Sequence, residues 1–231
     1  MCGLFGIVGQ GICKEDVSIF RDLMIFNAVR GVDATGFVSG KAEKTSKVWK
    51  ANHRVVKKVA DPIYFLQTLE KNEEDALDNV FHDFKLGHTR WRTTGENSAA
   101  AAQPFLKDNV IGTHNGTVHF DYNGFNSDSD RLYSMISDIG IKATVLQMKE
   151  QDGYALVFFD KTTGMINILR NSKKALWFTY HPTRQVLYYS TEIGMLRAAL
   201  DRRGIKYNEC YYPETNWSYT INTQNLKDHG K

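Results

Sequence analysis

Apolar and polar residues alternate in short blocks that predict a chain of strands with helices between them. Residues 2–8 are apolar and interrupted by glycine, which is typical of a strand buried at the centre of a sheet. Residues 15–29 place apolar side chains at helical spacing and stop at Gly31. The chain is therefore expected to open with a strand followed by a helix.

The rest of the pattern predicts more strands than helices. Asp61-Pro62 is expected to begin a helix that ends near Asn79, and residues 84–124 carry short strands separated by Gly, Asn and Thr. Further strands are predicted at 37–39, 47–49, 53–59, 154–159, 165–169, 176–180 and 186–190, and further helices at 128–139 and 192–201. Consecutive antiparallel strands flanked by helices favour an α+β layered fold. No linker or repeat divides the chain, so residues 1–231 are expected to form a single domain.

Composition, charge and cysteine content limit the classes of protein to which the chain can belong. With 231 residues, 42% of them hydrophobic and 24% charged, the chain is long enough to bury a core without disulfides or metal. No apolar run approaches the roughly 18 residues of a membrane span and no secretory signal is evident, so a cytoplasmic protein is expected. A net charge of +3 makes nucleic-acid binding improbable, and the basic stretch 41–58 is interpreted as a solvated face. Three widely spaced cysteines, Cys2, Cys13 and Cys210, indicate free thiols.

Cys2 is the strongest candidate for chemistry. Removal of Met1 would leave one residue that carries both a thiol and the free α-amine of the chain. The amine titrates near pH 7.7 to 8.0 and the thiol near roughly 8.5, so the amine can accept the thiol proton without a histidine. The alternative is a small buried cysteine with no reactive role.

Three other segments offer groups that an amide hydrolase needs. Asn115-Gly116 provides a side-chain amide and an unhindered N–H for an oxyanion, although the same pair is a common turn. Arg90 could hold a carboxylate through its two-pronged guanidinium. Asp128 could bind an α-ammonium, although Ser-Asp is also a helix N-cap signal.

Five motifs together resemble the class II glutamine amidotransferases. They are Met1-Cys2-Gly3-Leu4-Phe5-Gly6-Ile7, Arg30-Gly31-Val32-Asp33-Ala34-Thr35-Gly36, Gly87-His88-Thr89-Arg90-Trp91, His114-Asn115-Gly116 and Ser127-Asp128-Ser129. They occur in the order and approximate spacing of that family and extend the resemblance over nearly the whole chain. The resemblance implies the four-layer αββα sandwich of N-terminal nucleophile hydrolases, built mainly from antiparallel sheets.

The resemblance also implies roles for individual residues. Cys2 would be the nucleophile, its amine the general base, and Asn115 with the Gly116 N–H the oxyanion hole. Arg90 and Asp128 would hold the α-groups of L-glutamine beneath a closing segment, Trp91 to about Ser98. The remaining residues implied are Thr93 and Thr94 near the substrate carboxylate, an Arg30–Asp33 ion pair supporting the nucleophile strand, and His88 and His114 as supporting residues.

Two departures from the family concern the branch and the length. Thr94 stands where the sugar-phosphate aminotransferase branch has histidine, and residues 101–105 only partly match an Asn-Ala-Gln-Pro-Phe pattern of the phosphoribosyl branch. The family's synthase domain is not expected within this chain. The expectation is a glutaminase without cofactor or metal that delivers ammonia to a separate synthase.

Two alternatives stay open. One is an N-terminal nucleophile amidohydrolase that acts on another γ-glutamyl or amide substrate. The other is a catalytically silent module that binds a partner.

Overall fold

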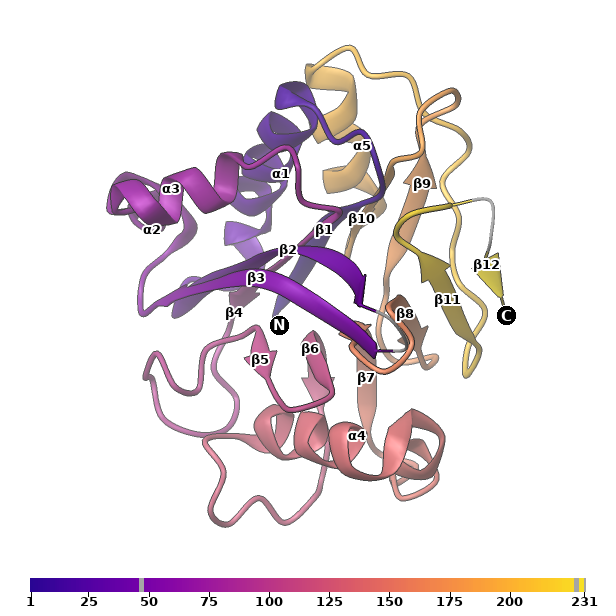
Figure 1. Cartoon of the computed structure of the whole chain (residues 1–231). Coiled ribbons are helices and arrows are strands. Elements are labelled where there is room, and N and C mark those ends of the chain that lie inside the picture. Colours follow the sequence, from indigo (N-terminus) through magenta and orange to yellow (C-terminus); the bar gives the residue numbers. More distant parts are fainter. Residues whose placement is uncertain (46–47, 227–228, 231) are drawn as a thin grey trace.

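Two antiparallel sheets lie face to face between outer layers of helices in the computed structural model, which describes residues 1–45, 48–226 and 229–230 (Figure 1). The first sheet has the strand order β3-β2-β4-β1-β10-β9 and the second β12-β11-β8-β7-β6-β5. The bounds in the first sheet are β1 Gly3–Val8, β2 Ala34–Thr45, β3 Val48–Lys58, β4 Phe84–Arg90, β9 Trp177–Tyr180 and β10 Leu187–Ser190. Those in the second are β5 Phe105–Leu106, β6 Val110–Thr117, β7 Gly153–Asp160, β8 Met165–Arg170, β11 Ser218–Asn222 and β12 His229–Gly230.

Helices cover the outer face of each sheet. The first sheet packs against α1 (Lys14–Phe26), α2 (Pro62–Gln67), α3 (Lys71–Asp78) and α5 (Ile193–Arg202), and the second against α4 (Asp128–Val145). The order helix, sheet, sheet, helix is the predicted αββα sandwich, so the predicted fold class is confirmed.

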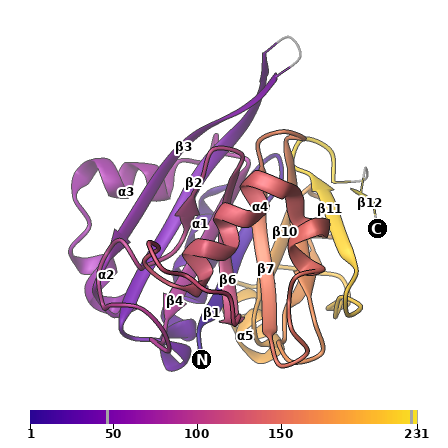
Figure 2. The same cartoon turned by 90° about the horizontal axis from the view of Figure 1, so that it is seen from below.

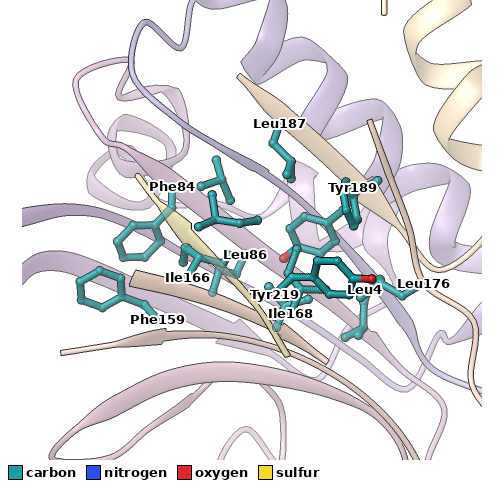
Figure 3. Close-up of a cluster of buried hydrophobic side chains, with 14 of the residues drawn as sticks. Leu4, Phe84, Leu86, Phe159, Ile166, Ile168, Leu176, Leu187, Tyr189 and Tyr219 are labelled. Atoms are coloured by element: carbon teal, nitrogen blue, oxygen red, sulfur yellow. The ribbon is translucent and has the colours of Figure 1, made fainter. Parts of the chain in front are cut away.

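The largest core cluster fills the space between the two sheets. Side chains of β1, β4 and β10 meet those of β6, β7, β8 and β11 there, and ten residues of the cluster are labelled in Figure 3. Phe84 of the first sheet stacks on Phe159 of the second, with ring centroids 4.9 Å apart. Burying such aromatic pairs stabilises sheet packing beyond the area they remove from water. The two sheets are therefore fixed face to face by apolar packing.

Strand β1 occupies the position predicted for it. It pairs with β4 on one side and β10 on the other, and all six residues are buried because helices cover one face and the second sheet the other. Its register sets Gly3 opposite Thr89. The first residues of the chain consequently lie beside the end of β4.

Two strands are much longer than their hydrophobic pattern predicts. The strand expected over 37–39 is part of the twelve-residue β2. The strands expected over 47–49 and 53–59 fall mainly within one strand, β3, although Lys47 lies outside the described residues. Together β2 and β3 form a long arm that projects beyond the rest of the molecule (Figure 2). Ladder hydrogen bonds need no apolar side chain, so a largely polar hairpin extends further than apolar alternation indicates.

The helix predicted from Asp61-Pro62 to Asn79 is two helices. Asp61 caps α2 as predicted, with its carboxylate accepting from the N–H groups of Ile63 and Tyr64. The α2 helix ends at Thr68, whose hydroxyl donates to the Tyr64 carbonyl and whose own carbonyl accepts from Lys58. A lysine on a neighbouring strand thus satisfies a helix-end carbonyl, which helical spacing alone does not reveal.

The C-terminal half contains features that the pattern missed. The α4 helix continues beyond residue 139 to Val145 across a kink at Gly140, whose φ of 79° is in the left-handed region open to glycine. Strands β11 and β12 were not predicted. No helix among the described residues is long and apolar enough to cross a membrane.

A buried lysine lies on β4, the strand that ends at Arg90. Lys85 is fully buried and its ammonium nitrogen donates to Ser39 Oγ at 2.6 Å and to the Asn79 carbonyl at 2.9 Å. Burial lowers the pKa of Lys85 from 10.5 to about 7. The folded chain therefore holds this side chain largely neutral in alkaline solution.

The stability of the protein should depend on pH through Lys85. Between about pH 7 and 10.5 the unfolded chain binds more protons at this residue than the folded chain, so the free energy of unfolding rises with pH in this window. The limiting slope is about 1.4 kcal/mol per pH unit. Urea unfolding at several pH values should show the wild-type free energy rising relative to that of Lys85→Met.

The exposed Lys14 on α1 provides the control. Lys14→Met should leave the pH dependence close to that of the wild type. A difference between wild type and Lys85→Met that stays constant from pH 7 to 10 would contradict this account of Lys85.

Candidate active site

Cys2 lies immediately before β1, where its thiol meets the end of β4. Its Sγ accepts from the Trp91 N–H at 3.4 Å and donates to the Trp91 carbonyl at 3.5 Å. Burial raises the pKa of the Cys2 thiol, while the Trp91 N–H, the N-terminal amine and Arg90 act in the opposite direction. The thiol is therefore protonated at rest and needs a base to become a nucleophile.

The N-terminal amine is adjacent to this thiol. In the chain as described the amine belongs to Met1, whose side chain is exposed. Its pKa is lowered, first by burial and then by the positive charges of Arg30 and Lys174. A lowered pKa increases the fraction of the amine that is in its neutral, proton-accepting form near pH 7.

Asn115 and Gly116 lie near the C-terminal end of β6, and Gly116 lines the same cavity as Cys2. The Asn115 carboxamide nitrogen is buried and has no hydrogen-bond partner among the described residues. A buried donor without an acceptor costs free energy, and an oxyanion between Asn115 and the Cys2 thiol would satisfy it. Gly116 has no room for a side chain, because a Cβ would lie 1.8 Å from the Gly153 carbonyl oxygen.

Arg90 and Asp128 lie on opposite sides of one loop. The Arg90 guanidinium donates to the carbonyls of Thr94 at 2.6 Å and Glu96 at 2.7 Å. The Thr94 hydroxyl donates to one Asp128 carboxylate oxygen at 2.7 Å, and the Val118 N–H donates to the other at 3.0 Å. The predicted closing segment therefore already occupies both groups expected to bind the substrate.

These side chains surround a single small cavity. Its volume is about 20 Å³, and its lining includes Cys2, Arg90, Thr93, Thr94, Gly116 and Asp128. A space of this size holds about one water molecule. A ligand with the size of an amino acid can enter only if the loop that bonds Arg90 and Asp128 moves.

The backbone and the side chain of Trp91 have different surroundings. The backbone contacts the Cys2 thiol, whereas the indole is 51% exposed. Thr93 lines the cavity. Trp91, Thr93 and Thr94 thus lie where the resemblance implies, around the thiol and the cavity.

Arg30 and Asp33 contact different parts of the site. Arg30 donates through Nε to the Cys2 carbonyl at 3.0 Å and forms an ion pair with Glu192. Asp33 accepts from the Arg92 N–H at 2.7 Å, and its own N–H donates to the Arg90 carbonyl at 3.0 Å. The expected Arg30–Asp33 ion pair is wrong, because each residue is held by a different part of the site.

The two motif histidines are buried beside β6. Burial lowers the pKa of His88 to about 3 and also lowers that of His114. Both imidazoles are therefore neutral near pH 7. His88 Nε2 contacts the His114 carbonyl at 3.2 Å and His114 Nδ1 contacts Ser129 Oγ at 2.8 Å, as expected of supporting residues.

Two residues near the site were not singled out from the sequence. Glu192, predicted only as the start of the last helix, lies beside Arg30. Gln103 lines the cavity and bonds to the backbone of His114. The partial match of residues 101–105 to a family pattern was the available signal for Gln103, and no local signal exists for Glu192.

Metal ligation has no support in the part of the chain that the structure describes. No group of three or more His, Cys, Asp or Glu side chains there could hold a metal ion. The three cysteines are free thiols.

Relatives of the chain are found by sequence among aminotransferases and amidophosphoribosyltransferases. A glutamine–fructose-6-phosphate aminotransferase (isomerizing) of Helicobacter pylori is 25% identical over 209 residues, which cover 89% of this chain and 32% of the relative. Amidophosphoribosyltransferases of Pasteurella multocida and Escherichia coli are each 31% identical over 121 residues, which cover 51% of this chain and 21% of theirs. The chain thus spans only about a fifth to a third of these relatives. No family model matches it.

Solved structures show the same fold. The glutamine phosphoribosylpyrophosphate amidotransferase of B. subtilis, complexed with ADP and GMP, matches with a TM-score of 0.70 and 19% identity over 99% of this chain and 48% of that one. A glutamine aminotransferase class-II domain protein of Silicibacter pomeroyi matches with a TM-score of 0.55 and 12% identity over 95% and 94% of the two chains. The resemblance stated from the sequence is confirmed: this chain is a relative of the class II glutamine amidotransferases and has the N-terminal nucleophile hydrolase fold of their glutaminase domains.

Proposed function

We propose that this chain is a glutaminase that hydrolyses the side-chain amide of L-glutamine through a thioester on Cys2. The observation that carries the proposal is that the Cys2 thiol, Arg90, Asp128 and Gly116 line one cavity, and that the unpartnered Asn115 carboxamide belongs to the residue next to Gly116. The relatives found by sequence are named as glutamine-dependent transferases, which supports the same substrate.

The first half of the reaction forms the thioester. After removal of Met1, the Cys2 α-amine takes the thiol proton and the sulfur bonds to the side-chain carbonyl carbon of glutamine. The charge that develops on the carbonyl oxygen is held by the Asn115 carboxamide and the Gly116 N–H. The carbon–nitrogen bond then breaks, and the proton held by the amine leaves with the nitrogen as ammonia.

The second half releases glutamate. Water gives a proton to the α-amine as its oxygen bonds to the thioester carbonyl carbon, and the same two donors hold the second oxyanion. The carbon–sulfur bond breaks, and the amine returns the proton to the sulfur. No cofactor is required for this balance of atoms.

Arg90 and Asp128 hold the substrate by its α-groups in this proposal. The guanidinium bonds the α-carboxylate in place of the Thr94 and Glu96 carbonyls, and the Asp128 carboxylate bonds the α-ammonium in place of the Thr94 hydroxyl. Glutamine therefore replaces the loop as the hydrogen-bond partner of Arg90 and Asp128, so these two side chains do not have to be desolvated again when the substrate binds. Closure of the loop over the substrate would keep water away while the thioester forms.

We further propose that the ammonia passes to an acceptor on a separately encoded synthase in the cytoplasm. The transferase names of the relatives support an acceptor. Adding the correct synthase should increase glutamate release and transfer the amide nitrogen to its product. Two other functions are the alternatives: hydrolysis of another γ-glutamyl amide and a silent module.

Replacing the nucleophile should abolish the reaction. Cys2→Ala should lower glutamate release from glutamine by on the order of 10³-fold or more, because neither thiolate nor thioester can form. The assay is glutamate and ammonia release by purified protein whose intact mass confirms loss of Met1. Cys210→Ala is the matched control and should keep wild-type turnover. Equal activity in Cys2→Ala and the wild type would refute the proposed mechanism.

Replacing the carboxylate-binding arginine should weaken substrate binding. Arg90→Lys keeps the charge but loses the two-pronged geometry, so the KM for glutamine should rise by about 10- to 100-fold, more than kcat falls. The exposed neighbour Arg92 provides the control, and Arg92→Lys should change KM little. A normal KM in Arg90→Lys would show that this guanidinium does not bind the substrate.

A further inference from the structure

Gln103 makes an unusual pair of hydrogen bonds beside the proposed oxyanion hole. Its side-chain oxygen accepts from the His114 N–H at 2.6 Å, and its side-chain nitrogen donates to the His114 carbonyl at 3.0 Å. The residue is 5% exposed and lines the cavity with Cys2. A neutral carboxamide can make both bonds to one peptide unit because it carries a donor and an acceptor.

The two bonds continue the β5–β6 ladder beyond the first residue of β5, on the segment that precedes this strand. The register pairs Leu106 with Ile111 and Phe105 with Gly112, so the position opposite His114 falls on Gln103. The side chain of Gln103 supplies there the donor and acceptor that a backbone would supply in a regular ladder. The edge of β6 thus stays ordered up to His114.

The next position along this edge belongs to Gly116. In an antiparallel strand, residues two apart direct their N–H groups to the same edge. The Gly116 N–H is therefore expected to follow the His114 N–H on the edge that faces the cavity, with Asn115 between them. Any rotation of the His114 peptide would move both proposed oxyanion donors.

The backbone of Gln103 is fixed from the opposite side. Its carbonyl oxygen lies 2.2 Å from where a Cβ on Gly36 would be, so it presses directly on strand β2 of the first sheet. The preceding turn is held by Ser98, whose carbonyl and hydroxyl accept from the N–H groups of Ala102 and Ala101 at 3.1 and 3.2 Å. Gln103 consequently links the first sheet and the closing segment to the oxyanion strand of the second sheet.

We propose that Gln103 is a positioning residue that holds the His114 peptide, and through it the Asn115 carboxamide and the Gly116 N–H, in the geometry that stabilises the oxyanion. It acts on the transition state through β6, because both polar atoms of its side chain are bonded to the His114 peptide. The role rests on the proposed glutaminase function. The Gln103 contacts themselves do not depend on which amide the site hydrolyses.

The test compares Gln103→Met, which keeps the length of the side chain but has no strong donor or acceptor, with the wild type. The kcat for glutamine should fall by about 10- to 100-fold with KM changed less than about threefold, because only transition-state stabilisation is lost. Alkylation of Cys2 by iodoacetamide, which needs no oxyanion hole, should keep its wild-type rate. Hydrogen exchange of the peptide spanning 110–117 should accelerate.

Gln224→Met is the matched control. The Gln224 side chain also donates to a backbone carbonyl, that of Ala42, at 2.9 Å, but it does not line the cavity. Its loss should leave kcat unchanged. Gln103→Asn serves as a second variant if Gln103→Met folds poorly, because it keeps the carboxamide but is one methylene too short to make both bonds.

The outcomes separate this inference from the proposed function. The positioning role would be overturned if both Gln103 variants kept the wild-type kcat and the wild-type exchange of 110–117. It would also be overturned if kcat fell only in proportion to the fraction of protein that is folded. If the wild type releases no glutamate, the glutaminase proposal fails. In that case hydrogen exchange still tests the positioning role. Exchange of 110–117 that is faster in Gln103→Met than in Gln224→Met would support the role, and exchange that is equal in the two variants would overturn it.

Discussion

The position of β1 at the middle of the first sheet is the constraint on which the rest of the site depends. A residue that uses its own α-amine as a base must lie at the chain terminus, yet a catalytic thiol must also be held rigidly. In the proposed mechanism, removal of Met1 meets the first demand, and the structure meets the second because β1 is buried along its whole length and begins only one residue after Cys2. Pairing with β4 fixes its register, and the Trp91 backbone then contacts the thiol.

The second constraint is that the site is closed. Arg90 and Asp128 are satisfied by the segment that follows Arg90, and the remaining space is about the size of one water molecule. Charged groups buried without partners are costly, so the loop stabilises the site by bonding to both groups, and in the proposed function it does so where the α-groups of glutamine would bind. Substrate entry must release these bonds, which couples loop movement to binding. A partner that favours the open loop would raise the rate, which fits the dependence on a synthase proposed above.

Sequence reasoning predicted the layered fold, and it could propose candidate site residues because their chemistry is local. A cysteine at position 2, an Asn-Gly pair and an arginine at a strand end are recognisable from residue type, and the five motifs supply their order. What could not be predicted depends on long-range contacts. Arg30 was expected to pair with Asp33, but the fold brings Glu192 from the last helix to it. The break after α2 likewise depends on Lys58, a side chain from a neighbouring strand.

Gln103 and the β2–β3 arm illustrate the same limit. Glutamine is a polar residue of a type that is mostly exposed, so the sequence does not indicate a buried role for Gln103. Only the β5–β6 register shows that its side chain replaces the backbone hydrogen-bond partner of His114. The arm is long because its ladder bonds extend past the apolar residues that were used to predict it. Both features are set by strand pairing, which a hydrophobic pattern predicts only weakly.

The most direct test of the account is to treat the purified protein with 6-diazo-5-oxo-L-norleucine, a glutamine analogue that alkylates nucleophiles, and to map the adduct by mass spectrometry. The account predicts an intact mass without Met1 and a single adduct on Cys2, suppressed by excess glutamine. An adduct on Cys13 or Cys210, or none on correctly processed protein, would contradict the claim that the N-terminal cysteine attacks glutamine.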